Sequence, residues 1–298
     1  MDRLGPVTTT TPLPSWRDGA AKSAVLEFVR SVTERGDSFV PPEQRIATFD
    51  NDGTLWCEKP MYPQAHFLIR RWGTQVKADP TLAERQPWKA VAEGDRSWLA
   101  SALDHLPELL KGVTEAYDGI TTDDFEAAVR AFFDTVQHPT LGVPYTHIAF
   151  RPMCELIELL HAHEFDVYIC SAGGRDFVRV IAHEMYGLRR THVIGSGPTL
   201  EYRDGAVYRT RGIEQPIADG AGKPVHIWTR TGQRPLLAGG NADGDGPMLE
   251  TARFALLIHH DDAAREFVYD TGAETVLAQA GERGWTIVSM KDDFETVF

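Results

Sequence analysis

Short runs of consecutive apolar residues alternate with helical patterns along most of the chain. The runs that predict buried strands lie at residues 46–49, 165–170, 191–195, 235–238, 254–259 and 285–290. Apolar residues at helical spacing predict helices over residues 16–34, 152–163 and 175–186, the last of which ends at Gly187. Strands that alternate with helices form parallel sheets with right-handed crossovers. We therefore expect an α/β fold with a doubly wound, Rossmann-like parallel sheet.

Two segments interrupt this alternation. Residues 56–146 are helical in pattern and rich in aromatic residues, which predicts a helical insertion whose own core contains Trp72, Trp88 and Trp98. Residues 201–208 predict a hairpin around Asp204-Gly205 that lies outside the main sheet. The expected domains are a core of residues 16–55 and 147–298 and a cap of residues 56–146. Residues 1–15, rich in Thr and Pro, are expected to form a disordered lead-in.

Composition narrows the class of protein. The 298 residues are 42% hydrophobic and 24% charged, which fits a globular protein with one full-sized domain and a large insertion, or with two domains. A net charge of −13 without a compensating basic run argues against binding to nucleic acid or to anionic membranes. The chain has no run of 18 apolar residues and no signal-like segment, so we expect a cytoplasmic protein. Three widely spaced cysteines indicate neither a disulfide framework nor a thiolate zinc site: Cys57, Cys154 and Cys170.

Three of the predicted strands end in polar turns. The turns are Asp50-Asn51-Asp52-Gly53-Thr54, Ser171-Ala172-Gly173-Gly174 and Gly240-Asn241-Ala242-Asp243-Gly244-Asp245. Asp50 and Asp52 project to the same side of an extended segment, so ionising both costs repulsion unless a cation or a shared proton relieves it. An Asp-rich turn that caps a helix would have a similar composition. Because ligands bind beyond the carboxyl ends of parallel strands, however, the three turns can converge on one site.

Together with Lys223, which precedes the third turn in the sequence, these turns contain the groups needed for transfer of a phosphoryl group. Asp50 is the candidate nucleophile, and Asp52 is the candidate acid and base. Ser171 and the backbone N–H groups after it, beginning with Ala172, are candidate phosphate donors. Lys223 can hold the phosphate and reduce its repulsion from the nucleophile. Candidate ligands for Mg²⁺, which prefers oxygen, are Asp50, Asp52, Asn241 and Asp245.

In order and spacing, these motifs resemble those of the haloacid dehalogenase-like (HAD) superfamily, and among its members the phosphoserine phosphatase type. Residues 50–54 match the first motif D-x-D-G-T in full, and residues 167–174 match the hydrophobic strand that ends in Ser. Lys223 best matches the lone lysine of the third motif. The fourth motif, usually G-D-x-x-x-D, appears at residues 240–245 and is followed by Pro247-Met248-Leu249. The departure is Asn241, which keeps an oxygen ligand and removes one negative charge.

The resemblance implies a Mg²⁺-dependent hydrolase of phosphomonoesters that acts on a small soluble metabolite, with phosphoserine among the candidates. In such a mechanism Asp50 forms an aspartyl-phosphate, and Asp52 protonates the leaving alkoxide. Mg²⁺ then lies between Asp50, the backbone carbonyl of Asp52 and Asn241. Residues 56–146 occupy the position of the family's C1 cap, a helical lid over the site. Glu58 is the candidate contact to a substrate amino group, although it could equally begin a solvated helix face. The sequence predicts no oligomeric state.

Other activities fit the sequence less well. Displacement of halide in this family usually proceeds without an aspartate at the position of Asp52, and phosphonate cleavage uses a cap lysine for which no candidate is evident. A catalytically weak relative that binds a phosphorylated ligand or a protein partner through its cap remains the alternative. Asn241 mildly favours that alternative, whereas the Asp50 and Asp52 pair and Lys223 oppose it. The run His259-His260-Asp261-Asp262 predicts a strand end, because adjacent strand residues point to opposite faces and cannot easily share a metal.

Overall fold

A parallel sheet forms the centre of the molecule. The computed structural model describes residues 12–101 and 105–298, and within these ranges six strands pair in the order β3-β2-β1-β6-β7-β8. All pairings between neighbouring strands of this sheet are parallel. The strands are β1 (Ile46–Phe49), β2 (Asp166–Gly174), β3 (Val193–Ser196), β6 (Leu237–Gly240), β7 (Phe254–His259) and β8 (Thr286–Ser289). The predicted doubly wound α/β fold is confirmed.

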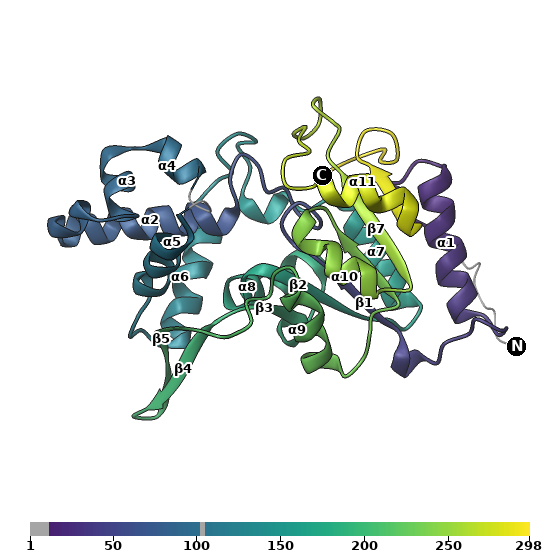
Figure 1. Ribbon diagram of the computed structural model, residues 1–298, viewed down its shortest axis with the longest axis horizontal. Coiled ribbons are helices and arrows are strands. Elements are labelled where there is room, and N and C mark those ends of the chain that lie inside the picture. The colour runs from purple at the N-terminus through teal and green to yellow at the C-terminus, as the bar shows by residue number, and fades with distance from the viewer. Residues whose placement is uncertain (1–11, 102–104) are drawn as a thin grey trace, which may run out of the picture.

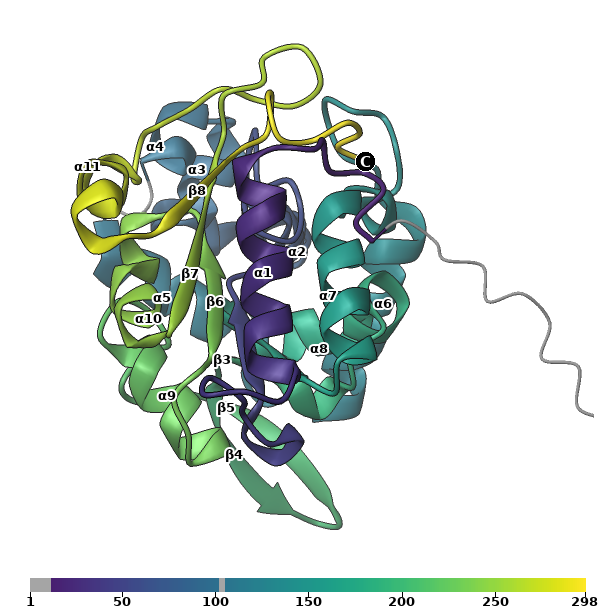
Figure 2. The same ribbon diagram turned by 90° about the vertical axis from the view of Figure 1, so that its right-hand side faces the viewer.

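Helices cover both faces of this sheet (Figure 2). One face packs against α1 (Ala20–Thr33), α7 (Arg151–Ala162) and α8 (Arg175–Tyr186). The other packs against α9 (Gly222–Thr231), α10 (Gly246–Thr251) and α11 (Glu274–Arg283). Alternate residues of β1 enter the two cores, with Ala47 and Phe49 in the first and Ile46 in the second. Burial on both faces explains why the strands read as continuous apolar runs in the sequence.

The order of the strands places β1 at the point where the direction of winding reverses. β1 pairs with β2 on one side and with β6 on the other, so that Phe49 lies opposite both Ile169 and Gly239. The backbone N–H of Asp50 donates to the carbonyl of Gly239 at 2.9 Å. The three polar turns therefore begin at nearly the same level of the sheet, at the position where ligands bind in open α/β folds.

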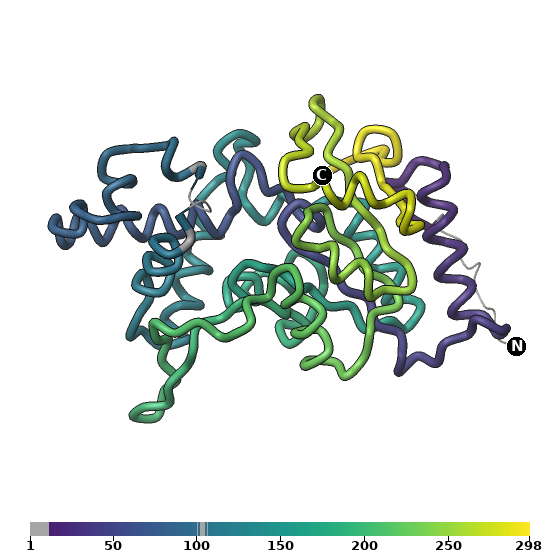
Figure 3. The backbone as a smooth tube through the Cα atoms, in the orientation of Figure 1, coloured from purple at the N-terminus to yellow at the C-terminus, as the bar shows by residue number. Residues whose placement is uncertain are grey.

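The helical insertion extends from one side of the core (Figures 1 and 3). Its helices are α2 (Pro63–Ala78), α3 (Trp88–Glu93), α4 (Arg96–Ala100), α5 (Leu106–Ala116) and α6 (Thr122–Thr135). Trp72 and Trp88 are 2% and 1% exposed, which confirms their predicted place in the core of the insertion. The prediction is wrong for Trp98, which is half-buried and stacks on His105 at a centroid distance of 5.6 Å. The domain boundaries at residues 56 and 146 stay a prediction.

Aromatic side chains join the insertion to the core. The ring of Phe177, on α8, lies 5.3 Å from that of Phe67 on α2 and 5.1 Å from that of Phe133 on α6. An ion pair of 2.7 Å between Arg130 and Glu184 adds a second link between α6 and α8. The three phenylalanine side chains belong to the larger of the two cores, which therefore continues from the sheet into the insertion without a break.

The predicted hairpin is present and forms a second link between core and insertion. It consists of β4 (Pro198–Arg203) and β5 (Ala206–Ile213), and it is longer than the predicted range of 201–208. Asp204 and Gly205 have positive φ angles of 50° and 85°, as expected for a tight Asp-Gly hairpin turn. The backbone of Arg209 exchanges hydrogen bonds of 2.9 Å with Gly119 and Ile120, just before α6.

Several boundaries and helices differ from the sequence-based expectations. α1 begins at Ala20, because Trp16 instead pairs with Phe294 near the other end of the chain. The lead-in prediction is wrong for residues 12–15: Leu13 is buried, and Ser15 donates two hydrogen bonds to Glu155. Residues 1–11 of that lead-in lie outside the described residues. The patterns used above did not predict α9, α10 or α11. In the part of the chain that the structure describes, no helix is long and apolar enough to cross a membrane.

Two glycine substitutions should have opposite effects on stability. A Cβ at Gly239 would lie 2.6 Å from Cδ1 of Phe49, whose ring is fully buried, so Gly239→Ala should destabilise the fold by about 1–3 kcal/mol. A Cβ at Gly281, within α11, meets nothing within 4 Å, so Gly281→Ala should stabilise it by about 0.5–1 kcal/mol. Urea unfolding of both variants measures these changes. A Gly239→Ala protein as stable as the unmodified one would contradict the packing described.

Candidate functional site

The turns after β1 and β6 meet at a single buried lysine. Lys223, in the first turn of α9, is 2% exposed. Its ammonium donates to Oδ1 of Asp50 at 2.7 Å, to Oδ1 of Asp245 at 2.6 Å and to the carbonyl of Cys170 at 2.9 Å. The structure thus brings together three of the predicted site residues, and Cys170 connects them to the end of β2.

This cluster has more buried negative than positive charge. Burial raises the pKa of Asp50 well above its ordinary value; Lys223 opposes that shift, and the charges of Asp245 and Asp52 add to it. Burial lowers the pKa of Lys223, but the charges of Asp245 and Asp50 outweigh burial and the net shift is upward. One ammonium therefore serves two carboxylates, with Asp52 close by. A bound cation would relieve the remaining repulsion.

Asp52 is oriented by a tryptophan that the motif analysis did not single out. The indole Nε1 of Trp56 donates to Oδ1 of Asp52 at 2.7 Å, and Trp56 is 1% exposed. The other oxygen, Oδ2, lies 3.6 Å from the position of a Cβ at Gly173, so it faces the C-terminal end of β2. Burial and the charge of Glu58 raise the pKa of Asp52 to about 7, against the opposing hydrogen bond from Trp56.

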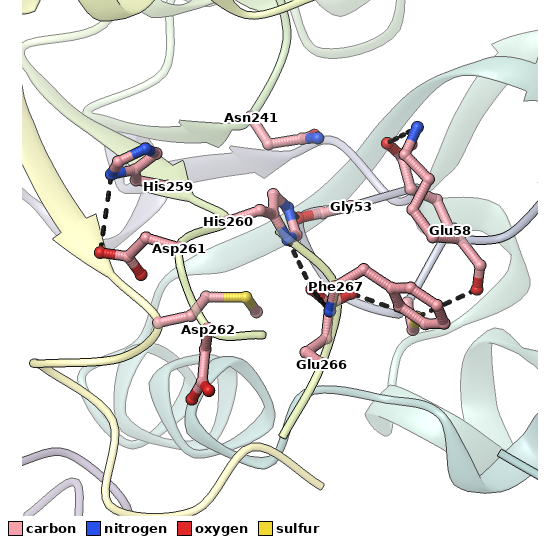
Figure 4. Close-up of polar contacts among 12 residues, drawn as sticks. Gly53, Glu58, Asn241, His259, His260, Asp261, Asp262, Glu266 and Phe267 are labelled. Atoms are coloured by element: carbon pink, nitrogen blue, oxygen red, sulfur yellow. Dashed lines mark hydrogen bonds and ion pairs between the residues drawn. The ribbon is translucent and has the colours of Figure 1, made fainter. Parts of the chain in front are cut away.

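The side chain of Asn241 lies directly over Gly53 (Figure 4). Gly53 has a φ of 74°, and a Cβ at this position would lie 2.1 Å from Nδ2 of Asn241. The hydroxyl of Thr54 donates to Oδ1 of the same amide at 3.0 Å. The glycine of the first motif therefore has two roles: it adopts a left-handed conformation and leaves room for the amide of the fourth motif.

The oxygen atoms around Asp50 fit the coordination of a hard divalent cation. The Asp50 carboxylate and the Asn241 amide supply oxygen, the ligand type that Mg²⁺ prefers, and the backbone carbonyl of Asp52 lies in the same turn. Asp245 fits less well as a direct ligand: Oδ1 binds Lys223, and Oδ2 accepts the backbone N–H groups of Asn241 and Ala242 at 2.9 and 3.0 Å. In residues 12–101 and 105–298 no group of three His, Cys, Asp or Glu side chains could hold a metal, so a cation here depends on amide and carbonyl oxygens.

The predicted turn at residues 171–174, which contains the candidate phosphate donors, is the last part of strand β2 in the structure. Ser171 is 1% exposed, and its hydroxyl accepts the backbone N–H of Gly173 at 3.1 Å. The backbone N–H of Gly174 donates to the side chain of Gln64, on α2, at 2.7 Å. Gln64 connects the insertion to this turn. No motif in the sequence marked it, because the contact exists only once α2 is placed beside the sheet.

A cavity of about 470 Å³, called here the Asp50 pocket, lies between the core, the insertion and the hairpin. The predicted residues that line it are Asp50, Asp52, Glu58, Ser171, Ala172, Lys223 and Asp245. Glu58 is 6% exposed and lies in the loop before α2, 3.3 Å from the ammonium of Lys59. The alternative that Glu58 begins a solvated helix face is therefore wrong, and its contact with a substrate stays a prediction.

His259 and His260 point in opposite directions (Figure 4), as their adjacent positions at the end of β7 predicted. His259 pairs with Asp270 at 2.9 Å on the half-exposed side. His260 is buried: Nε2 donates to the carbonyl of Gly53 at 2.8 Å, and Nδ1 lies 3.1 Å from Oε2 of Glu266, whose side chain is 0% exposed. The pair formed by His260 and Glu266 thus contacts the turn that holds Asp52, and the motif analysis did not predict this role.

The family comparison agrees with this geometry. Residues 47–250, more than half of the chain, match the model of the haloacid dehalogenase-like hydrolases. The chain belongs to the haloacid dehalogenase-like hydrolases. The match begins in β1 and ends in α10, so it contains all the turns that meet at Lys223. The resemblance inferred from the four motifs is confirmed at the level of this superfamily. No match was found among curated proteins.

Solved structures of similar fold cover most of this HAD protein. A functionally unknown protein from Anaerococcus prevotii is 16% identical to this chain, with a TM-score of 0.57. The alignment covers 90% of this chain and 91% of the Anaerococcus protein. A protein of unknown function from Bordetella pertussis is 19% identical, with a TM-score of 0.53. The alignment covers 82% of this chain and 98% of the Bordetella protein. A substrate-bound phosphoserine phosphatase is 17% identical and covers 72% of this chain and 86% of its own, but a TM-score of 0.40 is too low to bear on the substrate.

Removing the charge of Glu266 should destabilise this HAD protein more than removing that of Asp270. Glu266→Gln deprives the buried His260 of its carboxylate partner, which should cost about 1–3 kcal/mol of unfolding free energy. Asp270→Asn makes the same chemical change beside His259, where the carboxylate is 63% exposed, and should cost less than about 1 kcal/mol. Denaturant unfolding at neutral pH compares the two variants. Equal losses would show that burial does not distinguish the two pairs.

Proposed function

We propose that this HAD hydrolase cleaves phosphomonoesters of small soluble metabolites in the presence of Mg²⁺, through an aspartyl-phosphate on Asp50. The observation that carries the proposal is the placement of Lys223 between Asp50 and Asp245, in the lining of the Asp50 pocket. An oriented second carboxylate, Asp52, and the Ser171 turn line the same pocket. This combination supports in-line attack on phosphorus better than a simple binding role.

The proposed reaction has two steps. Lys223 holds Oδ1 of Asp50, so Oδ2 attacks phosphorus; the bond from Asp50 to phosphorus forms while the bond from phosphorus to the ester oxygen breaks. Protonated Asp52 gives its proton to the departing alkoxide. Asp52 then takes a proton from water, the resulting hydroxide attacks phosphorus, and Asp50 is released together with inorganic phosphate. The sum is one ester and one water converted into one alcohol and one phosphate.

The polar turns supply the surroundings of the phosphoryl group. Ser171 and the backbone N–H of Ala172 line the pocket and would donate to its oxygens. Asp50, the carbonyl of Asp52 and the amide oxygen of Asn241 would hold Mg²⁺. When bound, Mg²⁺ supplies positive charge that offsets the repulsion between the phosphoryl oxygens and the carboxylates. Asp245 keeps Lys223 and the 241–242 backbone in place.

Loss of the nucleophile should abolish turnover. With Mg²⁺ and a panel of phosphomonoesters, Asp50→Asn should lower kcat by at least about a thousandfold, because no aspartyl-phosphate can form. EDTA should have a comparable effect on the unmodified protein. Asp243→Asn is the matched control in the fourth motif: Asp243 accepts one hydrogen bond, from the backbone of Val276 at 2.9 Å, which an asparagine oxygen can also accept.

The outcomes separate the proposal from its alternative. A catalytically weak relative, which binds a phosphorylated ligand or a protein partner through its insertion, would turn over no ester in any of these assays. Turnover that survives in Asp50→Asn would also overturn the mechanism. Equal loss in Asp243→Asn would show that disturbance of the loop, and not loss of the nucleophile, explains the effect.

Restoring a carboxylate at position 241 should strengthen the binding of Mg²⁺. Asn241→Asp adds one negative charge and keeps the oxygen that accepts from Thr54, so the Mg²⁺ concentration at half-maximal rate should fall on the order of tenfold. Asn241→Ala should raise it. Mg²⁺ titrations of both activity and thermal stability give two independent measurements. An unchanged requirement in both variants would exclude this side chain from the metal site.

A further inference from the structure

The walls of the Asp50 pocket differ in character from the polar cluster around Lys223. Apolar side chains reach the pocket from the insertion, the hairpin and the loop after the hairpin. They are Leu68 of α2, Leu109, Leu110 and Val113 of α5, Ile213 of β5, and Ile217. A leaving group attached to a phosphate beside Asp50 would have to lie against this surface. It would therefore remove apolar area from water on binding.

The two cations of the pocket lining already have carboxylate partners. Arg209 and Lys223 are the cations in the pocket lining, all of which belongs to the described residues. Arg209 donates to Asp176 at 2.7 Å and lies 3.7 Å from the centre of the Phe125 ring, while Lys223 binds Asp50 and Asp245. Asp176 also pairs with Arg175 and Arg179. A substrate carboxylate could therefore bind Arg209 only by competing with Asp176 in this network of ion pairs.

The acidic residue predicted to recognise a substrate amino group is also engaged. Glu58 is almost fully buried, and its Oε1 lies 3.3 Å from the ammonium of Lys59. To bind an ammonium group of the substrate, Glu58 would have to exchange one cation for another, so the net gain would be small. Asp219 also lines the pocket, but it is exposed, so an ion pair between it and a substrate ammonium would contribute little to affinity. Neither charge of a phosphoserine-like leaving group therefore meets a buried, free partner outside the catalytic cluster.

From these contacts, and on the basis of the proposed phosphomonoesterase activity, we propose that the natural leaving group is an uncharged, predominantly apolar alcohol. Alkyl and aryl alcohols belong to this class, whereas serine does not. The wall formed by α5 and β5 then selects the substrate, and the turns around Lys223 perform the reaction. Each methylene group that leaves water for such a wall should raise affinity up to about fourfold.

The primary test is a series of esters assayed with Mg²⁺. We expect kcat/KM to increase from ethyl to butyl to hexyl phosphate, by about two- to fourfold for each added methylene, until the wall is covered. Phosphoserine should be a poorer substrate than butyl phosphate. A flat or falling series, or a preference for phosphoserine over hexyl phosphate, would overturn the proposal and leave the phosphatase activity itself intact.

A matched pair of variants locates the effect in the pocket wall. Val113→Thr replaces a methyl group by a hydroxyl at the half-buried wall of α5, and it should reduce kcat/KM for hexyl phosphate about three- to tenfold more than for ethyl phosphate. Val91→Thr makes the same change on α3, outside the pocket, and should leave the ratio of the two esters unaltered. If the ratio of kcat/KM for hexyl phosphate to that for ethyl phosphate were the same in both variants, the α5 wall would not be the surface that selects the leaving group.

A binding measurement separates failure of this inference from failure of the proposed function. Titration of alkyl phosphates into Asp50→Asn, followed by calorimetry, does not require turnover. If no ester is hydrolysed by the unmodified protein but affinity rises with chain length, the phosphatase proposal fails and the apolar site stands. If affinity is independent of chain length, the apolar site is overturned whether or not the protein is active.

Discussion

The bridge that Lys223 forms between Asp50 and Asp245 is the interaction on which the rest of the site depends. Each carboxylate is buried, and without the ammonium either one would be an uncompensated charge, which costs several kcal/mol. The three residues come from the end of β1, the turn after β6 and the start of α9. The crossovers of a doubly wound sheet are therefore needed before this cluster can form.

Around that cluster, the backbone approaches so closely that glycine is needed at several positions. Asn241 lies over Gly53, Asp245 lies against Gly240, and Phe49 lies against Gly239. From β7, His260 reaches the carbonyl of Gly53. The turn that holds Asp52 is thus held between β6 and β7. These packed, buried contacts fix the relative positions of the site side chains, which the motif residues alone would not do.

In the proposed function, reaction and substrate selection depend on different parts of the molecule. The polar turns at the strand ends contain the groups proposed for phosphoryl transfer, whereas the apolar walls come from the insertion and the hairpin. The aromatic contacts of Phe177 fix the insertion on the core, and the backbone hydrogen bonds of Arg209 join the hairpin to the insertion. A family with this arrangement can change its leaving group through the insertion without altering its chemistry, because the two sets of residues do not overlap.

The sequence alone determined the strands of the main sheet, the sheet type and the polar turns that form the candidate site. Consecutive apolar runs and the Asp50, Ser171 and Asn241 motifs are local signals, readable at a spacing of a few residues. The tertiary structure decided everything that depends on contacts between distant segments. Trp56 orients Asp52 from a position close in the sequence. Gln64, Arg209 and the pair of His260 and Glu266, by contrast, reach the site only because folding places distant segments beside the turns. The partners of Arg209 and Glu58, and hence the character of the pocket, likewise have no periodic signature, because charge pairing and burial are properties of the packed chain.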